Sequence, residues 1–133
     1  MLGFCKERLI SLDLRVCSNY KVYYDLERLL QVVGCCDNLE ELLLNYPQRS
    51  KVSRHQISLP KTLRLLHVGG NMPEELLAVI IGQIPKLTSV TLENNLFVTG
   101  DSITQSLPLG GLKKLSLHRC SGFTPENLHT ILK

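Results

Sequence analysis

Residues 87–95 read LTSVTLENN, and the order of apolar and polar positions in this stretch decides the fold. Its apolar positions are Leu87, Val90 and Leu92, and Asn95 closes it. Successive side chains of a strand point to opposite faces, so Val90 and Leu92 share one face while Thr91 between them takes the other. The stretch therefore predicts a short strand with one buried face and one exposed face.

The same pattern, L-x-x-L-x-L-x-x-(N/C), occurs five times along the chain. The copies are LISLDLRVC (9–17), LEELLLNYP (39–47), LRLLHVGGN (63–71), LTSVTLENN (87–95) and LKKLSLHRC (112–120), and their first leucines lie 30, 24, 24 and 25 residues apart. Near-equal spacing with matched apolar positions is typical of repeat architectures, in which stacked neighbours bury leucines that one repeat cannot bury alone. We expect strands near residues 11–15, 41–45, 65–69, 89–93 and 114–118.

The segments between these strands include three stretches with helical periodicity, at residues 25–34, 73–84 and 124–133. Pro73 suits a first helical position, and Glu74 and Glu75 favour the positive end of the helix that follows. Thr124 is the expected N-cap of the last helix. The polar insert at residues 47–61 predicts a loop with a short strand-like piece at residues 55–59, and Pro47 makes the preceding turn irregular because proline lacks an N–H donor.

The repeated pattern resembles that of the leucine-rich repeat family over nearly the whole chain. The resemblance implies an α/β solenoid of about five repeats, curved, with parallel strands on the concave side and helices and loops on the convex side. It also implies that the side chain at the ninth position, Cys17, Asn71, Asn95 or Cys120, hydrogen-bonds the backbone in the turn after the strand. We expect residues 1–133 to form a single domain. The alternative is that this domain is a segment of a longer solenoid.

Two further stretches relate the chain to F-box proteins, one to the F-box itself and one to a subtype of leucine-rich repeat. Residues 71–85, NMPEELLAVIIGQIP, are similar to the opening of an F-box, but the strand pattern of residues 87–95 follows at once, which favours a convex-side helix. Residues 112–133 resemble the cysteine-containing repeats of F-box substrate-recognition proteins, through Cys120, Phe123, Thr124, Glu126 and Leu128. This implies substrate recognition for a ubiquitin ligase in the cytoplasm or nucleus, with ligase components bound through a region missing from these residues.

Composition argues against several other classes of protein. The chain has 133 residues, a net charge of +3 and a sequence pI near 8.6, too weakly basic to predict nucleic-acid binding. It lacks an apolar run long enough to predict a membrane span. Its five cysteines are odd in number and Cys35 and Cys36 are adjacent, which suits a reducing compartment. No zinc-site spacing accompanies them, so we expect no metal.

The candidate chemistry of the chain does not predict an enzyme. Cys17 and Cys120 occupy the pattern position of turn-stabilising side chains, where thiols are inert. His67 and His118 point outward from strands with no nucleophile at catalytic spacing, and an isolated outward histidine is usually solvated. Gly69 and Gly70 lack the lysine and spacing of a phosphate loop. We expect no catalytic residue and no cofactor.

The outward strand positions remain as the candidate site. Five strands about 4.8 Å apart make a strip about 20 Å across, and Leu43 and Leu65 are apolar residues that point out of it. The residues expected to contact a protein or peptide partner are Asp13, Arg15, Glu41, Leu43, Asn45, Tyr46, Leu65, His67, Thr91, Glu93, Lys114, Ser116 and His118. The function favoured is a protein-binding module, and the alternative is a structural interior segment of a longer repeat array with no ligand of its own.

Overall fold

The computed structural model of the protein describes residues 8–15, 26–46, 57–96, 98–106 and 111–132. They form one five-stranded sheet in the order β1-β2-β3-β4-β5, with every neighbouring pair parallel. The strands are β1 (Ser11–Asp13), β2 (Glu41–Asn45), β3 (Leu65–Gly69), β4 (Ser89–Glu93) and β5 (Lys114–His118). The helices are α1 (Leu26–Val33), α2 (Glu74–Gly82), α3 (Asp101–Ser106) and α4 (Pro125–Leu132). The predicted α/β fold with parallel strands alternating with helices is confirmed.

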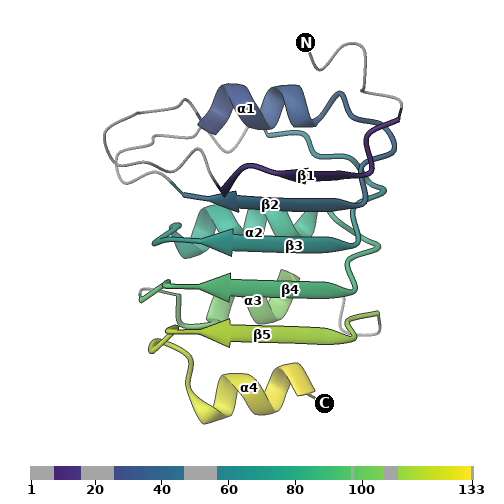
Figure 1. The fold of residues 1–133 in the computed structure, drawn as a ribbon. Coiled ribbons are helices and arrows are strands. Elements are labelled where there is room, and N and C mark those ends of the chain that lie inside the picture. Colours follow the sequence, from purple (N-terminus) through teal and green to yellow (C-terminus); the bar gives the residue numbers. More distant parts are fainter. Residues whose placement is uncertain (1–7, 16–25, 47–56, 97, 107–110, 133) are drawn as a thin grey trace.

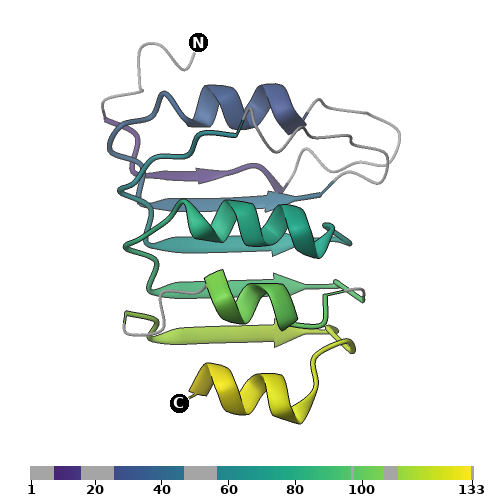
Figure 2. The same ribbon diagram turned by 180° about the vertical axis from the view of Figure 1, so that it is seen from behind.

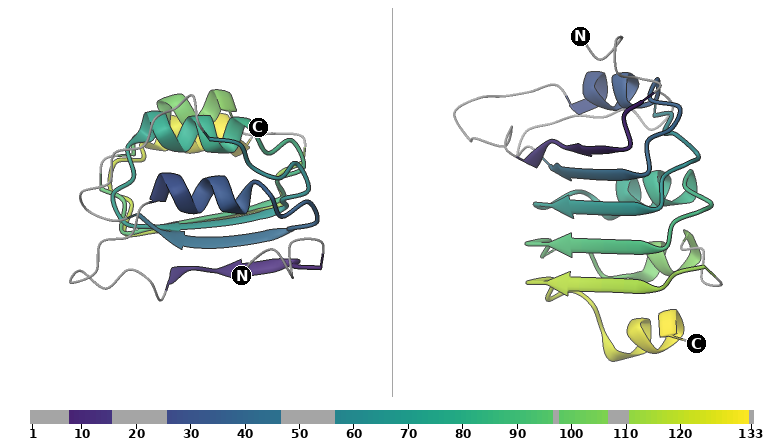
Figure 3. Two further views of the ribbon diagram at one scale, coloured as in Figure 1. Left: turned by 90° about the horizontal axis from the view of Figure 1, so that it is seen from above. Right: turned by 45° about the vertical axis from the view of Figure 1, so that its right-hand side comes forward.

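The strands and helices form two layers (Figure 1). All four helices lie on one side of the sheet, as the view from behind in Figure 2 and the view from above in Figure 3 show. The opposite side carries no helix among the described residues. We call it the helix-free face; it consists of the outward side chains of Ser11, Asp13, Glu41, Leu43, Asn45, Leu65, His67, Ser89, Thr91, Glu93, Lys114, Ser116 and His118, together with Gly69.

The register of the sheet places matching pattern positions side by side. Leu12, Leu42, Leu66, Val90 and Leu115 pair in sequence across the five strands. The three inner members are at most 1% exposed, whereas Leu12 and Leu115 at the two ends are half-buried. The row is therefore the centre of a core that the helices complete.

The helices contribute the other half of this core. Leu77, Ile80 and Ile81 of α2 are at most 1% exposed, as are Leu26 and Leu30 of α1. Fully burying one such side chain contributes roughly 1.5–3 kcal/mol, so the sheet and its helices stabilise one another. The stripe of apolar residues at helical spacing explains why these segments fold as helices against the sheet.

The joints between repeats use polar side chains. The Glu74 carboxylate, in the first turn of α2, accepts hydrogen bonds from Thr99 Oγ1 at 2.9 Å and from the Gly100 N–H at 2.8 Å, immediately before α3. The predicted cap of α4 is confirmed, since Thr124 Oγ1 accepts from the Asn127 N–H at 3.2 Å. In both cases a side-chain oxygen accepts a hydrogen bond from a backbone N–H at the start of a helix, where the helix itself provides no acceptor.

Several expectations need correction. The first strand ends at Asp13 rather than at residue 15, because Arg15 lies in a tight turn and bonds back to Asp13. Residues 57–59 are not a strand; the Gln83 side-chain amide instead donates to the Ile57 carbonyl and accepts from the Leu59 N–H, taking the place of a strand partner. Helix α3 was not expected. The expectations for Cys17, Pro47 and residues 55 and 56 concern residues outside the described ranges.

The side chain at the ninth pattern position bonds the backbone at all three described sites, and at Asn95 it does so in the turn after its own strand, as expected. Asn95 is 1% exposed; its amide donates to the Met72 carbonyl at 3.1 Å and accepts from the Val98 N–H at 3.2 Å. Cys120 is half-buried, and its thiol donates to the Leu92 carbonyl at 3.4 Å. Asn71 is exposed, and its carbonyl oxygen accepts from the Leu96 N–H of the following repeat.

Candidate interaction face

The structure brings most of the predicted contact residues together on the helix-free face. The pairing places Asp13, Leu43, His67, Thr91 and Ser116 in one row across the sheet, flanked by Glu41, Leu65 and Lys114 on one side and by Asn45, Glu93 and His118 on the other. Two predicted members lie just beyond their strands, Arg15 after β1 and Tyr46 after β2. The same register adds Ser11 and Ser89, which the predicted set did not include.

The apolar part of the face is small and lies at its middle. Leu43 pairs with His67, and Leu65 pairs with Glu41, so the two leucines are diagonal neighbours on adjacent strands. Diagonal neighbours on one face are about 7–8 Å apart, within reach of long side chains. Both leucines are half-buried, as is Tyr46, whose hydroxyl has a raised pKa because of partial burial. They form an apolar contact area between charged side chains.

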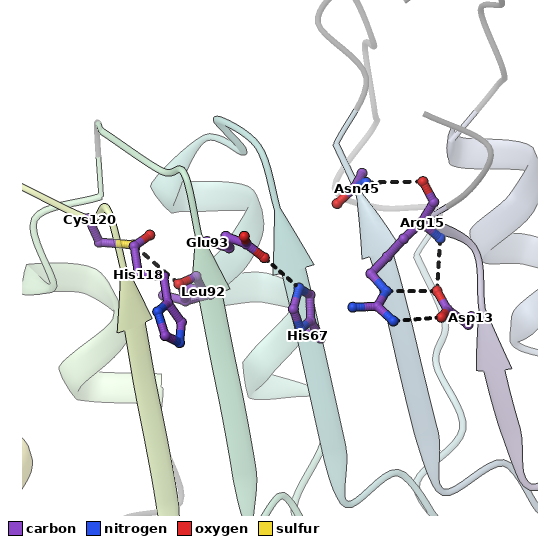
Figure 4. A network of polar contacts seen from close by, with 8 residues as sticks. All are labelled: Asp13, Arg15, Asn45, His67, Leu92, Glu93, His118 and Cys120. Carbon is purple, nitrogen blue, oxygen red and sulfur yellow. Dashed lines mark hydrogen bonds and ion pairs between the residues drawn. The ribbon is translucent and has the colours of Figure 1, made fainter. Parts of the chain in front are cut away.

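The first charged group is a two-pronged pair at the end of β1 (Figure 4). Arg15 Nη2 and Nε donate to the two carboxylate oxygens of Asp13 at 2.8 and 2.9 Å, and the Arg15 N–H donates to the same carboxylate. These hydrogen bonds from Arg15 lower the pKa of Asp13 from 3.8 to about 2, and the bond to Asp13 raises the pKa of Arg15. Both side chains remain about half exposed, so the pair is available to a partner.

The second charged group joins β3 to β4. His67 Nε2 lies 3.3 Å from Glu93 Oε2, an ion-pair distance if the imidazole is protonated, without the alignment of a hydrogen bond. The side chain of His67 is only 13% exposed, in contrast to the solvated histidine expected from the sequence. Burial is the main cause of its lowered pKa; the positive charge of Arg15 acts in the same direction, while Glu93 and Asp13 oppose it.

Asn45 lies between these two charged groups. Its amide nitrogen donates to the Arg15 carbonyl at 3.1 Å, and its amide oxygen lies over Gly69 of the next strand. The absence of a side chain at Gly69 is what leaves room for the amide. The order along this edge is therefore Asp13 with Arg15, then Asn45, then His67 with Glu93.

The β5 side of the face is less tightly organised. Lys114 and His118 are exposed, and Thr91 and Ser116 are half-buried. The His118 carbonyl, not its ring, is the group near Cys120, whose Sγ lies 3.5 Å away (Figure 4). His67 of β3 and His118 of β5 lie two strands apart, with β4 between them.

Among the described cysteines, Cys36 belongs to the scaffold, whereas Cys35 is exposed and Cys120 is half-buried. Cys36 is buried and its thiol has a raised pKa because of that burial, which is the environment of an unreactive thiol. Within the described ranges, no group of three or more His, Cys, Asp or Glu side chains is arranged to hold a metal ion. No helix in the same ranges has both the length and the apolar composition required to cross a bilayer.

Comparisons of the chain with protein-family models, with curated proteins and with solved structures find no match. The geometry of the helix-free face and the repeated pattern of the chain are therefore the observations that bear on function.

Proposed function

We propose that the chain is a binding module of the leucine-rich repeat type that recognises a protein or peptide across its helix-free face. Leu43 and Leu65, with Tyr46 at their edge, supply the apolar anchor. The pairs Asp13–Arg15 and His67–Glu93 flank the anchor and select the partner by charge.

The observation that carries this proposal is the placement of half-buried apolar side chains between polar groups that are already held in position. Asp13, Arg15 and Asn45 are linked by hydrogen bonds within the chain, so little further ordering is needed when a partner binds. Interfaces commonly have this form, with an apolar centre ringed by polar contacts.

The repeated pattern supports a more specific role. Five copies of L-x-x-L-x-L-x-x-(N/C) fall on five adjacent parallel strands in matching register. On the resemblance to cysteine-containing repeats at residues 112–133, the proposed role is substrate recognition for a ubiquitin ligase in the cytoplasm or nucleus. The contact with the ligase itself would lie outside this face.

The proposal is tested with a displayed library of random peptides selected on the wild-type chain. Peptides enriched by the wild type are then measured against the double variant Leu43→Asp/Leu65→Asp. Loss of two interface anchors costs about 2 kcal/mol or more, so we expect binding to weaken by a factor of about 30. The matched control is Val32→Asp, which also replaces a partly exposed apolar residue (39% exposed) but lies on α1, in the helix layer.

Each variant is first compared with the wild type by thermal unfolding, since a face variant that unfolds would lose binding for a trivial reason. Selected peptides that bind the folded double variant as tightly as the wild type would refute the proposed face. Equal losses in the double variant and in Val32→Asp would place the contact elsewhere.

A further inference from the structure

Among the described residues, strand β5 lies at one end of the sheet and is covered less than the other full-length strands. In β2 and β4 the second and fourth residues are buried, whereas Leu115 and Leu117, at the same positions of β5, are half-buried. Leu112 and Phe123, next to this strand, are half-buried as well. Apolar side chains that are buried in the inner repeats are thus partly exposed at the β5 end of the sheet.

The backbone at the start of each strand follows one rule. The residue before a strand accepts two hydrogen bonds through its carbonyl oxygen from the start of the next strand. This holds for Ile10, Glu40, Arg64 and Thr88, each of which accepts two N–H groups at 2.7–3.0 Å. Lys113 is the next residue in this series, and none of the described residues donates to its carbonyl.

The backbone at the end of the inner strands follows a second rule. The residue after the strand donates its N–H to the last residue of the next strand, as Tyr46, Gly70 and Asn94 do at 2.7–2.9 Å. Arg119 is the next in this series and shares its φ of 56° with Asn94, a left-handed conformation that is uncommon for residues other than glycine. Within the described part of the chain, the Arg119 N–H has no acceptor.

We propose that the β5 edge binds an acidic, extended segment of a partner protein, which adds to the sheet as a sixth parallel strand. Its first two N–H groups would donate to the Lys113 carbonyl, and its last strand residue would accept from the Arg119 N–H. Alternate apolar side chains of the segment would cover Leu115 and Leu117. Addition of a strand to a sheet edge is an established mode of peptide recognition.

The charge of the edge determines the kind of partner. Lys113, Lys114 and Arg119 are all exposed, and residues 112–120 contain no acidic side chain. Lysines on an edge strand also protect a sheet from pairing with uncharged strands. Both observations favour an acidic partner. The basic side chains disfavour pairing with uncharged or basic strands, but they attract a strand with carboxylates at the facing positions.

A second copy of this chain fits the edge less well than an acidic segment. It would have to offer β1, the strand at the other end of the sheet, which spans only Ser11–Asp13. The one carboxylate of β1, Asp13, is already paired with Arg15. Residues 113–119 of the β5 edge are more than twice as long and would remain mostly uncovered.

The probe is an end-blocked heptapeptide, Ser-Glu-Val-Glu-Val-Glu-Ser, matched in length to residues 113–119 and carrying a fluorophore for anisotropy. Its valines fall opposite Leu115 and Leu117, and its glutamates face Lys114 and His118. In a second peptide, each glutamate is replaced by lysine. In a third, the acidic sequence is kept, but the two backbone nitrogens that would donate to the Lys113 carbonyl are methylated. We expect the acidic peptide to bind at least about tenfold tighter than either, with an effect that weakens as salt is added.

The chain variants are Lys113→Glu/Lys114→Glu and, separately, Arg119→Gly, which removes a charge while keeping the left-handed conformation accessible. The control is Lys61→Glu/Lys86→Glu, an equal charge change at exposed lysines before inner strands. We expect the acidic peptide to lose at least about tenfold in affinity on the first variant and to be unaffected on the control. Binding should also slow hydrogen exchange at the Arg119 N–H.

Three results would overturn the proposal. Equal binding of the acidic and basic peptides would refute the charge assignment, and equal binding of the methylated peptide would refute strand addition. A concentration-dependent oligomer abolished by Lys113→Glu/Lys114→Glu would assign the edge to a second copy instead. Lys114 also belongs to the helix-free face, but these variants leave its proposed anchor, Leu43 and Leu65, intact. Failure of the β5 edge is therefore seen with the acidic peptide, and failure of the helix-free face with the peptides selected from the library.

Discussion

The amide oxygen of Asn45 occupies the space above Gly69, where any other residue would carry its Cβ. Gly69 does not have a positive φ, so its conformation does not require glycine; the neighbouring side chain does. The same amide donates to the Arg15 carbonyl. One missing side chain in β3 therefore positions a link between β2 and the end of β1.

Gly69→Ala should displace Asn45 and destabilise the chain. A Cβ at this position overlaps Asn45 Oδ1, and overpacking of this kind costs about 1–3 kcal/mol. Urea unfolding measures the loss. The matched control is Gly82→Ala in the last turn of α2, where an added Cβ meets nothing within 4 Å and alanine is favoured over glycine by about 1 kcal/mol. Equal stability of Gly69→Ala and the wild type would contradict the steric account.

Asn95 and Asn71 hold the same position in successive repeats, yet their replacement should have unequal costs. Asn95→Ala leaves the buried Met72 carbonyl and Val98 N–H without partners, each costing about 1–3 kcal/mol. Asn71→Ala removes one exposed hydrogen bond, with a cost of about 1 kcal/mol or less. Chemical denaturation of the two variants compares them directly, and similar losses would argue against the burial of Asn95.

Alanine substitutions in the central buried row should cost less stability at β5 than at the inner strands. Leu66→Ala removes a fully buried side chain and should cost about 2–5 kcal/mol. Leu115→Ala makes the same substitution at the same pattern position. Because the Leu115 side chain is only half-buried, this variant should cost markedly less. Thermal unfolding under identical conditions provides the comparison. A larger loss for Leu115→Ala would mean that the β5 end is better covered than its exposure indicates.

His67 should make the chain less stable as the pH falls below 6.5. Its pKa in the folded chain is lowered from 6.5 by burial first and by Arg15 second, so the unfolded chain binds a proton that the folded chain resists. Stability is therefore full above pH 6.5 and declines as the pH falls toward the lowered value. His67→Gln should show a smaller change in urea midpoint between pH 7.5 and pH 5.5 than the wild type.

Asp13 provides the control for this pH experiment because its effect falls in a separate range. Its pKa is lowered from 3.8 to about 2, so its stabilising contribution is present above pH 3.8 and is lost as the pH falls toward 2. Asp13→Asn should not reduce the change between pH 7.5 and pH 5.5, and should slightly enlarge it, because the Asp13 charge opposes the lowering of the His67 pKa. If His67→Gln does not reduce it either, another group must cause it.

The sequence pattern alone determined four of the five strands and the alignment of their buried positions, while their parallel order was expected from the resemblance to leucine-rich repeats. Four predicted strand ranges coincide with β2, β3, β4 and β5, because alternating side chains and a near-constant repeat length leave one way to align the buried leucines. The row from Leu12 to Leu115 could be read from pattern positions alone. The helices at residues 25–34, 73–84 and 124–133 followed from apolar periodicity in the same way.

The tertiary structure alone decided what lies between and upon these strands. Helix α3 has the polar sequence DSITQS, and it forms where Glu74 holds Thr99 and Gly100 and where Ile103 is buried against the core. The turn of Arg15 back to Asp13, the amide of Asn45 over Gly69 and the burial of His67 are likewise invisible in the pattern. Each of these features depends on a contact between residues in different repeats or on the turn that follows a strand. Periodicity specifies which face of the sheet a side chain takes, but not which neighbour it contacts there.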